Sequence, residues 1–140
     1  MINHRDHEMS EFNADHGQIS VEFLRRSREY LAHGMLLQAS EKGWGAAAHA
    51  AKLFAESCDD LEYERHEQLD EVVTEMGIAT NNHRQISQWA KSANRLHRNF
   101  YDDDLDADAI AACLEDARNF VSVAFRLTGL PLTGLPPVEP

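Results

Sequence analysis

The sequence predicts an all-α fold, an up-and-down bundle of about five helices within one domain. Five successive segments carry apolar residues three and four positions apart, which is the spacing of an amphipathic helix. Short stretches with Gly, Asn or Asp separate these segments, and no stretch alternates apolar and polar residues as a half-buried strand does. With 140 residues, of which 43% are hydrophobic, the chain is long enough to bury one core.

The two ends of the chain lack this periodicity. Residues 1–18 hold His4, His7 and His16 among acidic side chains, and we expect a flexible tail there, although such a cluster could bind a metal adventitiously. The same stretch has no apolar run, so we expect no signal peptide. Residues 129–140 are rich in Pro and Gly and are predicted to form an extended tail. This leaves residues 19–128 as the helical-bundle domain.

The first two helices are expected to pack closely. The first begins at Ile19 and stops at Gly34, since glycine accepts the left-handed conformation that ends many helices. The second runs from about Met35 to Cys58 and carries a ridge of small residues four positions apart. Such a ridge allows another helix to approach closely, within the bundle or across a dimer, and this packing offsets the low helix propensity of glycine. The ridge consists of Ala39, Gly43, Ala47 and Ala51.

The third helix is predicted over residues 59–76, with Gly77 as its end. It is strongly acidic, with eight acids against the single base Arg65. Glu62, His66 and Asp70 are four apart and line up on one side, where a metal site is conceivable. A solvated acidic face is the favoured interpretation. The apolar face comprises Leu61, Leu69, Val72, Val73 and Met76.

The fourth segment, residues 81–104, is the one place where this acidic chain becomes basic. Residues 81–101 contain four Lys and Arg residues and no Asp or Glu. At about 100° per residue, its side chains sort onto three sides of a helix. The core side is predicted to hold Ile86, Trp89, Ala93, Leu96 and Phe100; the opposite side Arg84, Gln88, Lys91, Arg95 and Arg98; and the flank between them His83, Asn94, His97 and Tyr101.

The last helix is predicted to begin after a cap at Asp106 or Asp108 and to end at Gly129. Asp104, Asp106, Asp108 and Glu115 imitate a calcium-binding loop. The turn of such a loop requires Gly where this chain has Ala109, so we reject calcium and interpret the acids as caps at a positive helix terminus.

Charge and motif content exclude several classes of function. The net charge of −11 argues against broad, sequence-blind binding of duplex DNA, but it allows a local site for a nucleotide or RNA. No apolar run is long enough to predict a membrane span. The chain lacks the Glu-x-x-His pairs of di-iron proteins, the phosphate-binding glycine loops, His-Glu-x-x-His and Gly-x-Ser-x-Gly. We therefore expect neither a metal nor a cofactor.

The two cysteines, Cys58 and Cys113, have no metal-binding spacing, and we expect small buried hydrophobic residues. Their small number favours a reducing cytoplasm.

The flank of the fourth helix is the first candidate for a functional site. His97 could act as a general acid or base, because its reference pKa is near neutral. Arg95 and Arg98 could hold a phosphate, and Asn94 and Tyr101 could orient a hydroxyl or a base. The opposing interpretation is structural: a basic helix matches the acidic third segment, and His97 is a satisfied histidine at the edge of the core.

Three stretches resemble the HEPN superfamily, and its PaREP-like branch in particular. They are LAHGMLLQASEKGWGAAAHAAKLFAE at residues 31–56, ANRLHRNFY at 93–101 and ACLEDARNFVSVAFRL at 112–127. The likeness spans about residues 20–127 in the same order. It implies a helical bundle that forms a homodimer with a cleft between protomers.

Many proteins of this superfamily cleave RNA without a metal through an Arg-x4-6-His motif, and others bind nucleotides or accompany a nucleotidyltransferase in toxin–antitoxin pairs. Here no His follows Arg95 at that distance, whereas Arg28 and His33 have the spacing in a different helix. The resemblance adds Lys42 and Trp44 of the Ala39–Ala46 run to the candidate ligand-binding residues Asn94, Arg95, Arg98 and Tyr101.

We therefore expect a HEPN-like dimeric binding module for a nucleotide, an RNA or a protein partner, with a toxin–antitoxin or stress-related role. One alternative is a metal-independent endoribonuclease that uses His97. Another is a helical-hairpin interaction scaffold, since Gly34 and Ala46 fit a tetratricopeptide spacing, although no second copy follows.

Overall fold

The computed structural model describes residues 4–58, 61, 63 and 68–130, with side chains described from residue 16 onward. This part of the chain contains five α-helices and no strand, which confirms the predicted all-α class. The helices are α1 (His4–Ala32), α2 (Leu36–Glu56), α3 (Leu69–Thr80), α4 (His83–Asp102) and α5 (Ala107–Thr128).

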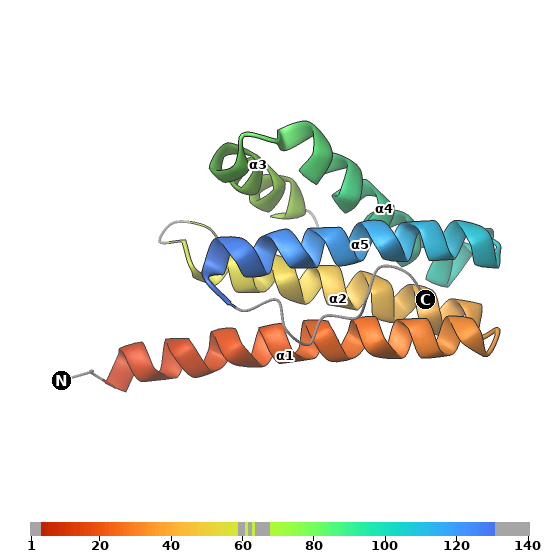
Figure 1. Cartoon of the computed structure of the whole chain (residues 1–140), viewed down its shortest axis with the longest axis horizontal. Helices are drawn as coiled ribbons and strands as arrows, with labels where there is room; N and C mark the ends of the chain where they lie inside the picture. The colour runs from red at the N-terminus through yellow and green to blue at the C-terminus, as the bar shows by residue number, and fades with distance from the viewer. Residues whose placement is uncertain (1–3, 59–60, 62, 64–67, 131–140) are drawn as a thin grey trace.

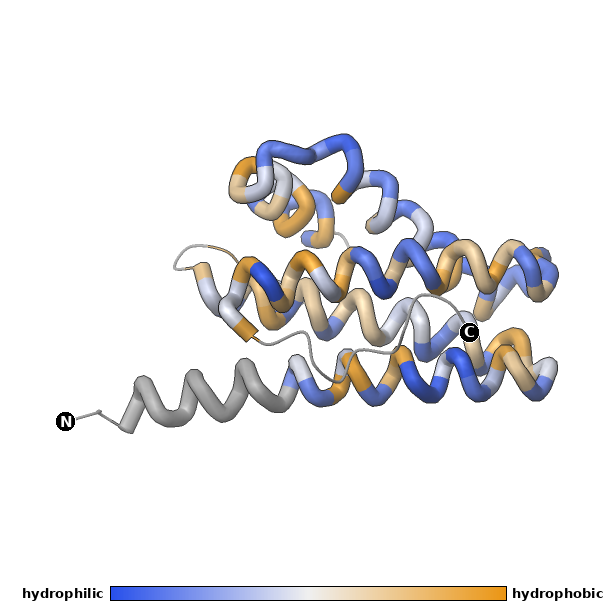
Figure 2. The backbone as a smooth tube through the Cα atoms, viewed as in Figure 1, coloured by the Kyte–Doolittle hydropathy of each residue, from blue (hydrophilic) through white to orange (hydrophobic). Residues whose placement is uncertain are grey.

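The helices form three layers with α2 and α5 in the middle (Figure 1). Helix α1 covers one side of this pair, and α4 covers the other, with the short α3 packed against α4. The long helices run up and down, so that the α1–α2 and α4–α5 turns lie at the same end of the bundle (Figure 1). Figure 2 shows that α2 is largely hydrophobic, whereas α4 is largely hydrophilic.

Helices of the same chain pack against the ridge of small residues on α2. Ala39, Ala47 and Ala51 are buried. A Cβ added at Gly43 would meet Leu114 of α5 and would lie 2.9 Å from Leu96 of α4. The ridge therefore serves the bundle, because the neighbouring helices α4 and α5 already occupy the space above it.

Two serine hydroxyls of α1 donate hydrogen bonds to backbone carbonyls of α2. Ser20 donates a hydrogen bond to the Ala46 carbonyl at 2.8 Å, and Ser27 donates one to the Ala39 carbonyl at 2.9 Å. Both serines are fully buried, so each bond satisfies a hydroxyl that has left water.

Three predicted helix ends are confirmed. Gly34 (φ 73°) and Gly129 (φ 80°) are left-handed after α1 and α5, as glycine allows at little cost. The Asp106 carboxylate caps α5 by accepting a hydrogen bond from the Ala109 amide at 2.8 Å.

Other predicted bounds were wrong. Helix α1 begins at His4 instead of Ile19, and His16, which was assigned to the tail, is buried. Gly77 lies inside α3, and Asn81 (φ 52°) ends that helix instead. A Cβ at Gly77 would lie 2.8 Å from the Cα of His83, so this glycine permits a close approach of α4.

Helix α3 also begins later than predicted, at Leu69. Residues 61 and 63 are described and are not helical. Glu62 and His66, two of the three residues of the conceivable metal site, lie outside the described residues. Within the described part of the chain, no helix has the length and apolar character needed to cross a membrane.

Candidate functional site

Most side chains of α4 have the burial or exposure that the sequence predicted. Ile86, Ala93 and Leu96 are buried, and Trp89 is half-buried. The five side chains predicted opposite them are all exposed; they are Arg84, Gln88, Lys91, Arg95 and Arg98. Phe100 was wrongly placed in the core, since 39% of it is exposed.

Asn99 occupies the buried position that Phe100 was expected to fill. Its Nδ2 donates a hydrogen bond to Ser40 of α2 at 2.8 Å, and its Oδ1 accepts from the amides of Asp104 and Leu105, each at 2.9 Å. This single amide joins α4 to α2 and builds the α4–α5 turn. Sequence reasoning missed it because a polar residue is expected to face water. The one sequence signal was that Asn99 comes shortly before residues 102–104, three acids where the chain was expected to leave the helix.

Four aromatic rings meet where the C-terminal part of α4 passes α2. The ring of His97 lies 4.8 Å from that of Trp44 at 34°, and its other neighbour is Tyr101, 5.8 Å away and edge-on. Phe100 lies 5.3 Å from Tyr101, also edge-on. Tyr101 is 74% exposed, whereas Trp44 and His97 are half-buried. We call Trp44, His97, Phe100 and Tyr101 the aromatic cluster.

The structure brings together only some of the predicted ligand-binding residues. Trp44, His97 and Tyr101 form one cluster, and Arg98 lies one helical turn before Tyr101 on the same helix. Lys42 points elsewhere, because its Nζ lies 4.2 Å above the ring of Phe23 on α1. The structure therefore separates the predicted ligand-binding residues of α2, because Lys42 lies against α1 and Trp44 lies against α4.

Arg95 belongs to the part of α4 that faces α5. Burial raises the pKa of the Cys113 thiol on α5, and the nearby positive charge of Arg95 opposes this rise. Ser92, one turn earlier, donates a 2.6 Å hydrogen bond to Asp116 of α5. The α4–α5 contact thus contains its own polar interactions, separate from the aromatic cluster.

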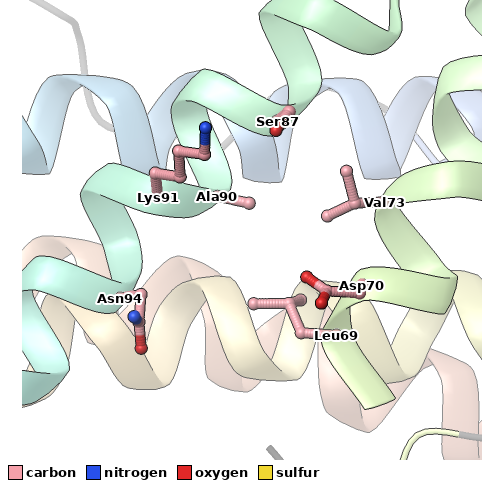
Figure 3. A pocket seen from close by; sticks show the side chains of 7 residues that line it. All are labelled: Leu69, Asp70, Val73, Ser87, Ala90, Lys91 and Asn94. Atoms are coloured by element: carbon pink, nitrogen blue, oxygen red, sulfur yellow. The ribbon is translucent and has the colours of Figure 1, made fainter. Parts of the chain in front are cut away.

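Asn94 instead lines a pocket between α3 and α4 (Figure 3). The pocket has a cavity volume of about 250 Å³. The Oδ1 atom of Asn94 is buried and accepts no hydrogen bond within the described residues. The lining residues are Leu69, Asp70, Val73, Ser87, Ala90, Lys91 and Asn94.

A third polar site lies between α1 and α2. The Nδ1 atoms of His16 and His49 are 2.9 Å apart, and the Nε2 of His16 is 3.6 Å from the Glu56 carboxylate. Burial, with smaller effects from the charges of His16 and Lys52, lowers the pKa of His49 to about 4. Burial raises the pKa of Glu56. Among the side chains described, no group of three or more His, Cys, Asp or Glu is arranged to hold a metal ion.

These observations define a small all-α bundle with an aromatic and basic surface on its fourth helix. The family model of the Archaeal PaREP1/PaREP8 family matches residues 15–121, and the chain belongs to this family. The match extends from α1 through most of α5 and includes every residue of the aromatic cluster. No curated protein and no solved structure matches the chain.

Proposed function

We propose that this protein is a binding module that holds single-stranded RNA or a nucleotide on the exposed surface of α4. The observation that carries the proposal is the exposed aromatic cluster beside the basic side of α4, within a stretch (residues 83–101) that contains no Asp or Glu. Proteins that bind single strands combine these two features, because bases stack on aromatic rings while basic side chains follow the phosphates.

The aromatic cluster offers a surface for stacking. Tyr101 is 74% exposed and Phe100 is 39% exposed, so both rings are accessible to a ligand. The ring of His97 contacts Tyr101 edge-on and also packs against Trp44 of α2. A base that stacks on Tyr101 therefore meets a preorganised surface, which lowers the entropic cost of binding.

The basic surface offers contacts for phosphate. Its five exposed side chains, four of them cationic, lie along one side of α4, in a chain whose net charge is −11. Because the rest of the chain repels polyanions, phosphates are directed to this helix. Arg98 connects the two features, as it is adjacent to His97 in sequence and one turn from Tyr101.

Fluorescence anisotropy with a short labelled RNA of adenine and uracil tests this function. Tyr101→Ala should weaken binding by roughly 1 to 3 kcal/mol, the usual worth of one stacked base, whereas Tyr101→Phe should retain most of the affinity. Arg98→Ala should reduce the slope of log affinity against log salt by about 0.7, the value for one phosphate contact of a single strand.

The matched control for Arg98 is Arg126→Ala, because Arg126 is exposed at the end of α5, at the opposite end of the bundle (Figure 1). It should leave binding unchanged. Equal losses for Arg98→Ala and Arg126→Ala would indicate a diffuse charge effect and would contradict a site on α4.

The ribonuclease alternative predicts a different outcome in the same samples. A strand on Tyr101 would contact His97, which is the candidate acid or base. Cleavage of the RNA in EDTA that disappears in His97→Ala would replace the binding module by a metal-independent nuclease. RNA that stays intact would support binding alone.

We also propose a HEPN-like homodimer, as the sequence resemblance implies. The small ridge of α2 gives no support to a dimer interface, because α4 and α5 fill it. A dimer interface would therefore use another surface, and the exposed Met35, next to the turn between α1 and α2, is an apolar candidate. Sedimentation velocity would show a dimer, and a monomer at micromolar concentration would refute it.

A further inference from the structure

The pocket between α3 and α4 is separate from the aromatic cluster and has a chemical character of its own. Leu69, Val73 and Ala90 supply apolar walls, and polar side chains approach from both helices (Figure 3). Its volume of about 250 Å³ is below the 300 to 1,000 Å³ of sites for drug-sized ligands. The pocket therefore suits one small group, of the size of a single base, better than a whole nucleotide.

The polar groups of the pocket lack partners within the described residues. The Oδ1 atom of Asn94 is buried without a hydrogen bond, and a buried polar atom of this kind costs about 1 to 3 kcal/mol until it is satisfied. The Asp70 carboxylate and the Lys91 ammonium form no ion pair or hydrogen bond with any described residue. A ligand that donates to the Asp70 carboxylate and accepts from the Lys91 ammonium would match the two charged groups of the pocket.

We propose that this pocket receives a guanine base. Guanine carries two adjacent donors, N1–H and the N2 amino group, which match a carboxylate in a bidentate manner. Its other edge carries the acceptors O6 and N7, which suit a lysine. Adenine and cytosine place a ring acceptor beside their amino group, and a carboxylate repels that acceptor.

The position of Lys91 connects the pocket to the phosphate-binding surface. Lys91 lines the pocket and also belongs to the exposed basic side of α4. A base held between α3 and α4 therefore has its phosphate beside that basic side. The inference rests on the proposed binding of a nucleotide or RNA and names the base that the site selects.

Isothermal titration calorimetry with GMP, IMP and AMP tests the inference on the full chain. IMP lacks only the N2 amino group, and AMP lacks both adjacent donors. GMP should bind about tenfold or more tightly than either, which is the usual discrimination of a bidentate base contact. Equal affinities for GMP and AMP would overturn the proposal.

Asp70→Asn should reduce the affinity for GMP about tenfold, since the amide cannot accept both donors, and it should not weaken the binding of AMP, whose ring acceptor the carboxylate repels. The matched control is Glu71→Gln, because Glu71 is the other exposed acid in the first turn of α3 and does not line the pocket. It should leave both affinities unchanged. Equal effects of the two variants would mean that only the net charge matters, and this too would overturn the proposal.

The RNA of adenine and uracil separates failure of this inference from failure of the proposed function. If that RNA binds through Tyr101 and Arg98 but GMP shows no preference over AMP, the guanine pocket falls and the binding module stands. If neither the RNA nor any nucleotide binds, both proposals fall.

Discussion

Helices α2 and α4 pack against each other, but the distinctive residues of α2 are covered by other helices and those of α4 are largely exposed. On α2, the small residues and the two interior glycines are covered by α1, α4 and α5. On α4, the cations and two aromatic rings remain exposed, and the buried side includes the polar Ser92 and Asn99. Helix α2 therefore organises the bundle, whereas α4 both belongs to the bundle and presents exposed cations and aromatic rings to solvent.

The run Ala39–Ala46 on α2 and the run around His97 on α4 differ in the same way. In the Ala39–Ala46 run, Gly43 faces Leu96 and Leu114, and Gly45 faces Phe23. These residues have a packing role, and only Trp44 of that run reaches the aromatic cluster. The run around His97 combines both roles, since Asn99 is structural and Tyr101 is exposed.

The largest effect is expected from a leucine on the ridge of α2. Even a Cβ at Gly43 would meet Leu114 and lie 2.9 Å from Leu96, so Gly43→Leu must displace α4 or α5. We expect the free energy of unfolding in urea to fall by about 3 kcal/mol or more. Gln88→Leu, on the exposed side of α4, should change it by less than about 0.5 kcal/mol. Similar losses at both positions would contradict the different roles of the two helices.

The next largest effect is expected at Asn99, where α4 contacts α2. Asn99→Ala removes three hydrogen bonds and leaves Ser40 and the amides of the turn without their partner. The free energy of unfolding should fall by about 2 to 3 kcal/mol. Asn82→Ala is the matched control at the other end of α4, because Asn82 makes no side-chain cap bond. A loss at Asn82 as large as at Asn99 would show that any asparagine at a helix end has this effect.

These positions also show what the sequence allowed us to predict. The number of helices, the end signals at Gly34 and Gly129 and the cap at Asp106 follow from local chemistry, and the structure confirms them. Gly77 and Asn99 were misread because their roles depend on residues of other elements, His83 and Ser40. Local periodicity contains no information about such tertiary partners.

The candidate site was predictable only in part for the same reason. Helical spacing indicated that His97 and Tyr101 share a flank, but it could not show that Trp44 lies against them while Lys42 lies over Phe23. It also could not show that α3 covers Asn94 and forms a pocket there. The start of α1 was missed because its first turns have no regular apolar pattern, although His16 is buried against α2.

The smallest predicted effect concerns the histidines of the two helices. His49 of α2 is half-buried beside His16, whereas His83 of α4 is exposed. A histidine in the unfolded chain takes up a proton near pH 6.5, but folded His49, with its pKa lowered to about 4, does not. The unfolded state therefore binds more protons in this interval, and stability is lost as the pH falls from about 6.5 to 4.

After allowance for solvent at the half-exposed ring, this loss should amount to about 1 to 2 kcal/mol. The raised pKa of Glu56 acts in the opposite direction, because its protonation favours the folded state as the pH falls. Urea unfolding at pH 7.5 and pH 5 measures the net result. His49→Gln should remove most of the loss, and His83→Gln should leave it in place. If His49→Gln and His83→Gln lose the same stability between pH 7.5 and pH 5, other groups cause the pH dependence. The pair of His16 and His49 would then not be its source.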